Sequence, residues 1–283
     1  MSISQLSKRG GLSIAFLVGA AVWFPIASNA TTLYVSTTFG NTINKVDTIT
    51  GTVTNFATNG VTLNVPTGLA FDSTGTLWEV NYGDSTINKI NVTTGTVTNF
   101  ATNGIALNGV QGLTVDSTDN LWISTGSGNA IDRINVTTGT VTNFATNGIA
   151  LNAPTGLAFD STGTLWESNY GNNTINNINT ATGTVTNFAT NGIALNAPTG
   201  LAFDSTGTLW ESNHGTSTIN NINTATGTVT NFATNGVAII PWGLAFAPPA
   251  SSTAVPEPLT IIGTLVGGTA ALRMRKKLKA VTK

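Results

Sequence analysis

The chain has 283 residues, of which only 8% are charged and none is cysteine. The absence of cysteine excludes disulfides, thiolate metal ligands and a cysteine nucleophile. Residues 31–250 carry eleven acidic and three basic side chains, a net charge of about −8, and this balance argues against nucleic acid and anionic membranes as partners.

The first 30 residues are typical of an export signal rather than of a folded domain. Lys8 and Arg9 precede an apolar run at residues 12–26, and Ser28 and Ala30 are the small residues that signal peptidase requires. We therefore expect a signal peptide over residues 1–30, cleaved after Ala30. A permanent amino-terminal membrane anchor is the alternative.

From residue 31 the sequence repeats about every 44 residues, and the repeat indicates the blades of a β-propeller. A fixed period of this length, built from short β-rich runs and turns, is typical of propellers rather than helical solenoids. Three landmarks recur once per copy: the Asn-Gly pair (Asn59, Asn103, Asn147, Asn191, Asn235), the glycine of a Gly-Leu pair (Gly68, Gly112, Gly156, Gly200, Gly243) and a leucine before an aromatic residue (Leu33, Leu77, Leu121, Leu165, Leu209).

Each copy divides into four short strand patterns, which is the content of one blade. In the second copy they cover residues 68–72, 76–81, 86–92 and 96–101, where β-branched and aromatic residues are frequent. Turn sequences separate them: Asp72 can form an Asx turn, and Gly75 and Gly95 can adopt positive φ.

The ends of the repeat region complement each other. The region starts in the second strand of a blade, at residues 33–36, and finishes with a first strand alone, at residues 243–247. We expect these two strands to pair and close an all-β, five-bladed propeller over residues 31–247, which would leave no exposed sheet edge at the seam. An open solenoid with half-blades at both ends is the alternative.

The loops between the second and third strands vary most between copies and are the expected ligand-binding rim. The Asn-Gly segments should share this rim, while the Asp-Ser-Thr-Gly and Thr-Gly turns should occupy the opposite one. The candidate ligand-binding residues are Asn81, Tyr82, Asn169, Tyr170, Asn213 and His214.

His214 is the only histidine in the chain. As a general base it would need an orienting partner, and Glu211 is the nearest carboxylate in sequence. A solvated loop residue at a position that tolerates His or Tyr is the favoured interpretation, and no catalytic residue is assigned.

Charged residues at repeated positions have structural interpretations that we prefer to a metal or cofactor site. Glu79, Glu167 and Glu211 could surround a cation, but hydrogen-bond acceptors between blades are favoured. Asp72, Asp160 and Asp204 fit Asx turns better than a metal loop. Lys45, Lys89 and Arg133 share one site and are expected to be solvated. No cofactor and no metal is predicted.

One aromatic residue recurs in each blade and could stack on sugars. Because an exposed ring of five would leave a large apolar patch, a packing layer between blades is the favoured interpretation. Trp242, in contrast, replaces a threonine at the closing seam and should plug it. The recurring residues are Tyr34, Trp78, Trp122, Trp166 and Trp210.

The repeat resembles the NHL and streptogramin-lyase-like propeller families over nearly all of residues 31–247. The residues that carry the resemblance are Pro154–Asp160, Gly163–Trp166, Ile175–Ile178 and Thr182–Val185. The resemblance implies the propeller fold and, for the lyases, histidines at the open face, of which this chain has one. NHL blades commonly have an Asp after the second strand, where this chain has Thr37, Asn81, Thr125, Asn169 and Asn213.

The carboxyl-terminal end resembles a PEP-CTERM sorting signal. A linker at 248–254 leads to Pro256, Glu257 and Pro258, an apolar segment at 259–272 and a basic cluster, all within 255–283. As a helix, 258–272 would be about 22 Å long, short for a hydrocarbon core of ~30 Å. The resemblance implies an exosortase-type protease as partner and cleavage near the Pro-Glu-Pro motif; a plain single-span anchor is the alternative.

Together these features predict an exported, monomeric binding or structural module. It would pass through a membrane-tethered intermediate to the cell surface or extracellular matrix, where a polysaccharide or another matrix component is a possible partner. A lyase or lactonase-like hydrolase acting at the open face of the propeller is the alternative function.

Overall fold

The computed structural model describes residues 32–236 and 239–248. The expected signal peptide, nearly all of the linker and the sorting tail with its apolar segment lie outside the described residues. The described part contains twenty-five β-strands and one short 3-10 helix, η1 (His214–Thr216). Within it, no helix is long and apolar enough to span a membrane.

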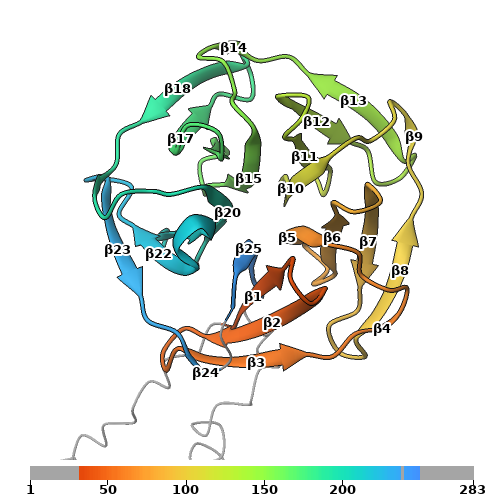
Figure 1. Ribbon diagram of the computed structural model, residues 1–283. Helices are drawn as coiled ribbons and strands as arrows, with labels where there is room; N and C mark the ends of the chain where they lie inside the picture. The colour runs from red at the N-terminus through yellow and green to blue at the C-terminus, as the bar shows by residue number, and fades with distance from the viewer. Residues whose placement is uncertain (1–31, 237–238, 249–283) are drawn as a thin grey trace, which may run out of the picture. The chain divides into compact units, whose positions relative to one another are not determined.

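The strands form five sheets around a central axis, so the fold is a five-bladed β-propeller (Figure 1). In blade 2, β5 (Pro66–Phe71) is innermost and is followed outward by β6 (Leu77–Asn81), β7 (Thr86–Ile90) and β8 (Thr96–Phe100), all antiparallel. This confirms the predicted fold class and the four antiparallel strands per blade. A further strand that the sequence did not predict, β4 (Asn59–Gly60), pairs in parallel with β8 at the outer edge.

Three further blades repeat this plan. Blade 3 contains β9 (Asn103–Gly104), β10 (Val110–Val115), β11 (Leu121–Thr125), β12 (Ala130–Ile134) and β13 (Thr140–Phe144). Blade 4 contains β14 (Asn147–Gly148), β15 (Pro154–Phe159), β16 (Leu165–Asn169), β17 (Thr174–Ile178) and β18 (Thr184–Phe188). Blade 5 contains β19 (Asn191–Gly192), β20 (Pro198–Phe203), β21 (Leu209–Asn213), β22 (Thr218–Ile222) and β23 (Thr228–Phe232).

Blade 1 combines both ends of the described chain. β1 (Thr32–Thr37), β2 (Thr42–Asp47) and β3 (Thr52–Phe56) are flanked by β25 (Pro241–Phe246) at the axis and by β24 (Asn235–Gly236) at the outer edge. β1 and β25 are antiparallel, with Leu33 opposite Phe246 and Val35 opposite Leu244. The predicted closure is confirmed, and both edges of the first blade are covered by carboxyl-terminal strands.

The hydrophobic cores lie between neighbouring blades. Trp78, Val80 and Ile87 of blade 2 share one cluster with Leu113 and Leu121 of blade 3. The five recurring aromatic residues are at most 6% exposed, which confirms the packing layer and rules out an exposed stacking array. Each of these five rings also meets a phenylalanine edge to face.

The Asp-Ser-Thr-Gly turns are closed as predicted, and each one also fixes a tryptophan. Asp72 Oδ1 accepts hydrogen bonds from the backbone N–H groups of Thr74 and Thr76, both at 2.9 Å. Its Oδ2 accepts from Trp78 Nε1 at 2.9 Å. The same indole bond links Asp116 to Trp122, Asp160 to Trp166 and Asp204 to Trp210.

The three basic side chains of the propeller lie over aromatic rings; Lys45 and Lys89 are half-buried rather than simply solvated, whereas Arg133 is exposed as expected. Lys45 Nζ is 4.6 Å from the Phe56 ring centroid, and Lys89 Nζ is 4.7 Å from that of Trp78. Arg133 lies over Trp122 and pairs with Asp116 at 3.4 Å. At these distances the ring quadrupole attracts the cation.

A serine on the second strand joins most neighbouring blades. Ser168 Oγ donates to the Thr199 carbonyl of blade 5 at 3.0 Å and accepts from Gly156 N at 2.8 Å. Blade 2 has Val80 at this position. The equivalent bridges run from Ser36 to Thr67, from Ser124 to Thr155 and from Ser212 to Trp242.

The Asn-Gly pairs do not lie where they were expected. Asn59 Nδ2 donates to the Thr94 carbonyl at 2.9 Å, so the pair packs on the turn between the third and fourth strands. Only the residues that follow it reach the loop between the second and third strands, where Val65 O accepts from Tyr82 N at 2.9 Å.

Candidate functional site

The loops between the second and third strands are held in place by the asparagines that end the second strands. Asn81 Oδ1 accepts from Asn64 N at 2.9 Å, and its Nδ2 donates to Thr86 Oγ1 at 3.0 Å. Asn169 and Asn213 make the same bond to Asn152 N and Asn196 N. All three are 0% exposed; their expected direct contact with a ligand is therefore corrected to support of the loops.

A second set of asparagines connects these loops across blades. Asn173, at the end of its loop, has φ of 59° and accepts from Ala197 N of blade 5 at 2.7 Å. Asn41 and Asn129 make the same bond to Val65 N and Ala153 N. Asparagine tolerates this left-handed conformation better than most residues, and these bonds connect blade 1 to blade 2, blade 3 to blade 4 and blade 4 to blade 5 along the rim.

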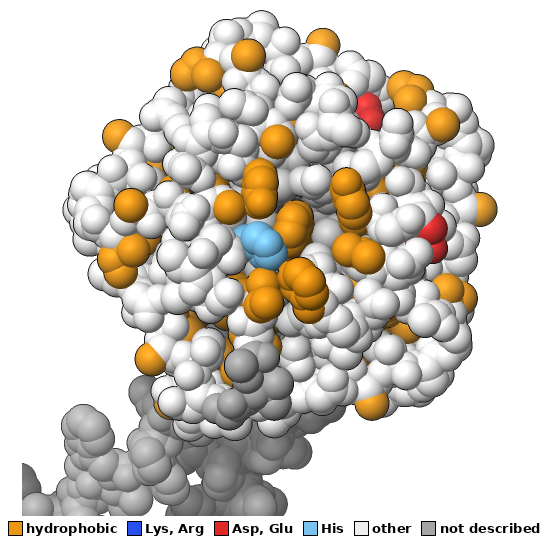
Figure 2. All heavy atoms as spheres, viewed as in Figure 1, with side chains coloured by type: hydrophobic (Ala, Val, Ile, Leu, Met, Phe, Trp, Pro, Cys, Tyr) orange, Lys and Arg blue, Asp and Glu red, His pale blue; other side chains and the backbone are white. Residues whose placement is uncertain are grey.

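Tyr170, His214 and Trp242 meet at the axial end of this rim, and we call them the axial cluster. Tyr170 stacks on Trp242 with ring centroids 6.1 Å apart and planes 20° apart. His214 meets Trp242 edge to face at 4.7 Å. Figure 2 shows the histidine near the centre of this face with hydrophobic side chains around it.

The accessible part of the predicted site is therefore tyrosine and histidine. Tyr82 and Tyr170 are 46% and 40% exposed, and His214 is half-buried. Trp242, also half-buried, was expected only as a plug, and Gln111 was not singled out. Both stand where the other copies have Thr67, Thr155 and Thr199, and this departure from the repeat was the signal that could have identified them.

Gln111 and Trp242 line the same small cavity on the axis, together with Gly68, Gly112 and Gly156. The cavity has a volume of about 10 Å³, roughly enough for a single water molecule. A wider hollow of about 150 Å³, lined by first-strand residues such as Leu157, Ala158 and Phe159, also lies on the axis. The constriction makes the axial cluster a surface site rather than the entrance to a tunnel.

Three polar atoms at this end of the axis are buried without a hydrogen-bond partner: Gln111 Oε1, His214 Nδ1 and Trp242 Nε1. An unpaired buried polar group costs about 1–3 kcal/mol. Side-chain adjustment that brings these atoms to a bound polar group would recover part of that cost. The cluster therefore combines flat ring surfaces with unused donors and acceptors.

His214 is uncharged at neutral pH in this environment. Burial lowers the pKa of His214, and the nearby backbone of Pro241 only partly opposes this shift. No ion pair with His214 occurs among the described residues. Glu211, the predicted orienting partner, is fully buried and accepts instead from Asn220 Nδ2 at 2.9 Å.

The buried glutamates are structural. They were predicted to accept hydrogen bonds from neighbouring blades, but the bonds they accept come from within their own blade. Glu79 accepts from Asn88 Nδ2 at 2.9 Å, and Glu167 accepts from Asn176 at 3.0 Å. Desolvation raises the pKa of Glu79, Glu167 and Glu211 to about 8, so they are protonated at neutral pH. Within the described residues, no group of His, Asp and Glu could hold a metal ion.

Comparisons with known proteins agree with this fold. A profile of the Virginiamycin B lyase family matches residues 2–257, whereas no curated protein matches the chain. A chain from the nidogen/laminin complex is 15% identical with a TM-score of 0.56, over 77% of this chain and 98% of that one. A catalytically inactive virginiamycin B lyase from Staphylococcus aureus, solved with quinupristin, is 19% identical with a TM-score of 0.48, over 77% and 74%.

Proposed function

This chain belongs to the virginiamycin B lyase family, and from that premise we propose that its propeller is a binding module whose ligand docks on the axial cluster. The proposal rests on one observation: residues that differ from blade to blade lie together at one end of the axis. A repeat protein can change such positions without disturbing its core. His214 has Thr38, Tyr82, Gly126 and Tyr170 at the sister positions of the other blades.

The cluster defines the chemistry of its ligand. Stacked Tyr170 and Trp242 present flat, amphipathic surface of the kind that dominates binding energy at interfaces. The unpaired atoms of Gln111 and Trp242 call for a polar group near the axis. The ligand is therefore an amphipathic molecule or side chain with a planar apolar face and at least one group that both donates and accepts.

The module would act outside the cytoplasm. The leader at residues 1–30, with cleavage after Ala30, supports export, and Pro256, Glu257 and Pro258 with the following apolar segment support sorting by an exosortase-type protease. The fold resembles that of a chain from the nidogen/laminin complex and is thus compatible with a binding module in an extracellular matrix.

A lyase acting at the same site is the second candidate, because family membership favours it. His214 would have to serve as the general base. It is uncharged, as a base must be, but it has no orienting carboxylate: Glu211 bonds to Asn220 inside the blade. Binding at the cluster needs no such partner and is therefore the better supported function.

The test is ¹⁹F NMR of the full chain labelled with 5-fluorotryptophan. Trp242→Thr assigns the Trp242 resonance and introduces the residue of the sister copies, so the blade should remain folded. The probes are virginiamycin B and a library of aromatic fragments with amide or hydroxyl groups. We expect at least one probe to shift the Trp242 resonance, and its affinity to fall at least tenfold in Trp242→Thr.

Thr230→Ala on the opposite rim is the matched control and should bind like the parent chain. The proposal fails if no probe shifts the Trp242 resonance. It also fails if binding is the same in Trp242→Thr, because the ligand would then occupy another surface.

A further inference from the structure

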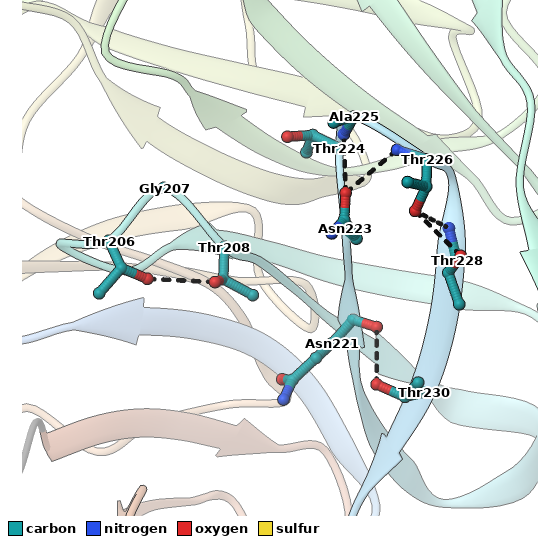
Figure 3. A pocket seen from close by; sticks show the side chains of 10 residues that line it. All are labelled: Thr206, Gly207, Thr208, Asn221, Asn223, Thr224, Ala225, Thr226, Thr228 and Thr230. Atoms are coloured by element: carbon teal, nitrogen blue, oxygen red, sulfur yellow. Dashed lines mark hydrogen bonds between the residues drawn. The ribbon is translucent and has the colours of Figure 1, made fainter.

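Two similar grooves lie on the opposite rim. In blade 5 a groove of about 570 Å³ runs between the turn at Thr206–Thr208 and the turn at Asn223–Thr226 (Figure 3). In blade 2 the corresponding groove has about 500 Å³. Both volumes fall within the range of small-molecule sites, about 300–1,000 Å³.

Hydrogen bonds fix both walls of the blade 5 groove. Asp204 Oδ1 accepts from Thr206 N at 2.9 Å and from Thr208 N at 3.0 Å. Asn223 Oδ1 accepts from the N–H groups of Ala225 and Thr226, at 3.0 and 3.1 Å. A ligand would therefore meet a surface that is already ordered, which lowers the entropic cost of binding.

The groove presents a row of hydroxyl groups in set orientations. Thr206 and Thr208 share a hydrogen bond at 3.1 Å, and Thr226 and Thr228 share one at 2.9 Å (Figure 3). Each hydroxyl offers one donor and two acceptor sites, so these pairs retain capacity for a ligand. The threonine methyl groups add small apolar surfaces between the polar atoms.

No charged residue lines the groove of blade 5. An ionic ligand would lose hydration there without gaining a counter-charge, and a purely apolar ligand would bury the hydroxyls unpaired. Neutral carbohydrate combines hydroxyl donors and acceptors with apolar C–H faces. We propose that these grooves bind neutral carbohydrate, one short stretch of sugar units in each groove.

The residues that line the groove of blade 5 recur in other blades. Blade 4 has the same residues as blade 5 at all ten lining positions, from Thr162 to Thr186. Blade 2 differs mainly in Lys89, which lies over Trp78 and replaces Asn221. Shallow sites bind single sugars weakly, but several of them on one rim can hold a polymer with avidity 10²–10⁴ above one site. The expected ligand is thus a polysaccharide, and this inference is independent of the axial cluster.

The test is affinity electrophoresis of the full chain in gels that contain dextran, galactomannan or xylan, with dextran sulfate as the charged comparison. Thr98→Tyr, Thr186→Tyr and Thr230→Tyr together fill the grooves of three blades. The matched control combines Asn99→Tyr, Asn187→Tyr and Asn231→Tyr, which are exposed on the same strands but face the other side of the sheet. We expect at least one neutral polymer to retard the parent and the control, and tenfold weaker retardation of the filled variant.

Retardation by dextran sulfate alone, or by none of the polymers, would overturn the inference. Equal retardation of the filled variant and the parent would also overturn it. If the filled variant does not fold, as judged by circular dichroism, replacing the same threonines with valine removes the hydroxyls without adding bulk. Trp242→Thr should be retarded like the parent, which separates this site from the axial one.

Discussion

At the scale of single residues, burial determines the charge of the three glutamates. Their folded pKa of about 8 is above the ordinary value of 4.5. The folded state therefore binds protons that the unfolded state has already released. Stability must fall as pH rises from about 4.5 to about 8, and these groups add no further slope above that range.

We expect the free energy of unfolding to be lower at pH 8 than at pH 5, because keeping the three buried glutamates protonated in the folded state becomes more costly as pH rises. Replacing Glu79, Glu167 and Glu211 with Gln keeps the acceptor for Asn88, Asn176 and Asn220 and removes the titration. The triple variant should be more stable than the parent at pH 8. Urea unfolding at several pH values measures both slopes, and equal slopes would show that the glutamates are charged in the folded protein.

Several residue roles could not be predicted from the sequence, for physical reasons. Asn81 ends a strand next to a variable loop, where a polar side chain is usually solvated, but its side chain instead accepts a hydrogen bond from the backbone N–H of Asn64. Lys89 was expected in solvent because separate cations usually are, and its ring partner is set by strand register. The shared position of Trp242 and Gln111 could not be predicted, because they meet only where the first strands come together around the axis.

At the scale of elements, the serine bridges tie each second strand to the next blade. Removing the hydroxyl of Ser168 leaves the buried Thr199 carbonyl and Gly156 N–H without this partner. Ser168→Ala should therefore lower the free energy of unfolding by about 1–3 kcal/mol. The exposed turn residue Ser205 is the control, and Ser205→Ala should change stability by less than about 0.5 kcal/mol. Equal effects of the two substitutions in urea unfolding would contradict the bridging role.

Strand content and turn chemistry were the most predictable features of the elements. The four antiparallel strands and the Asx turns follow from β-branched runs and fixed Asp-Ser-Thr-Gly positions, and both were confirmed. The two-residue parallel strands such as β4 were missed because a pair of residues carries no periodicity. The predicted position of the Asn-Gly pairs was also wrong, because two residues carry no periodicity from which to place them.

At the scale of the whole molecule, the ring depends on strands separated by the full length of the domain. β25 pairs with β1, and Asn235 Nδ2 donates to the Thr50 carbonyl at the outer edge. Deleting residues 241–247 exposes an edge and removes a packed strand, a loss of several kcal/mol from a total of about 5–15. The shortened chain should melt at a clearly lower temperature in calorimetry. Melting at the parent temperature would mean that closure does not stabilise the ring.

Closure and blade number were predictable because the two half-blades are complementary, whereas the function at the axis was not. The repeat constrains the positions that all blades share, and the site consists of positions that they do not share. The family profile shows that the chain belongs to a family named for a lyase. Binding and lyase chemistry at one site therefore have to be separated by measurement.

The most direct measurement follows virginiamycin B by chromatography during incubation with the parent chain and with His214→Tyr, which introduces the residue of two sister copies. A general base contributes about 10²–10⁴-fold to a rate, so an enzyme that used His214 would lose nearly all turnover. We predict that the parent consumes virginiamycin B no faster than buffer does, and that His214→Tyr unfolds within about 0.5 kcal/mol of the parent. Turnover by the parent that disappears in His214→Tyr would contradict the binding-module account and establish the lyase.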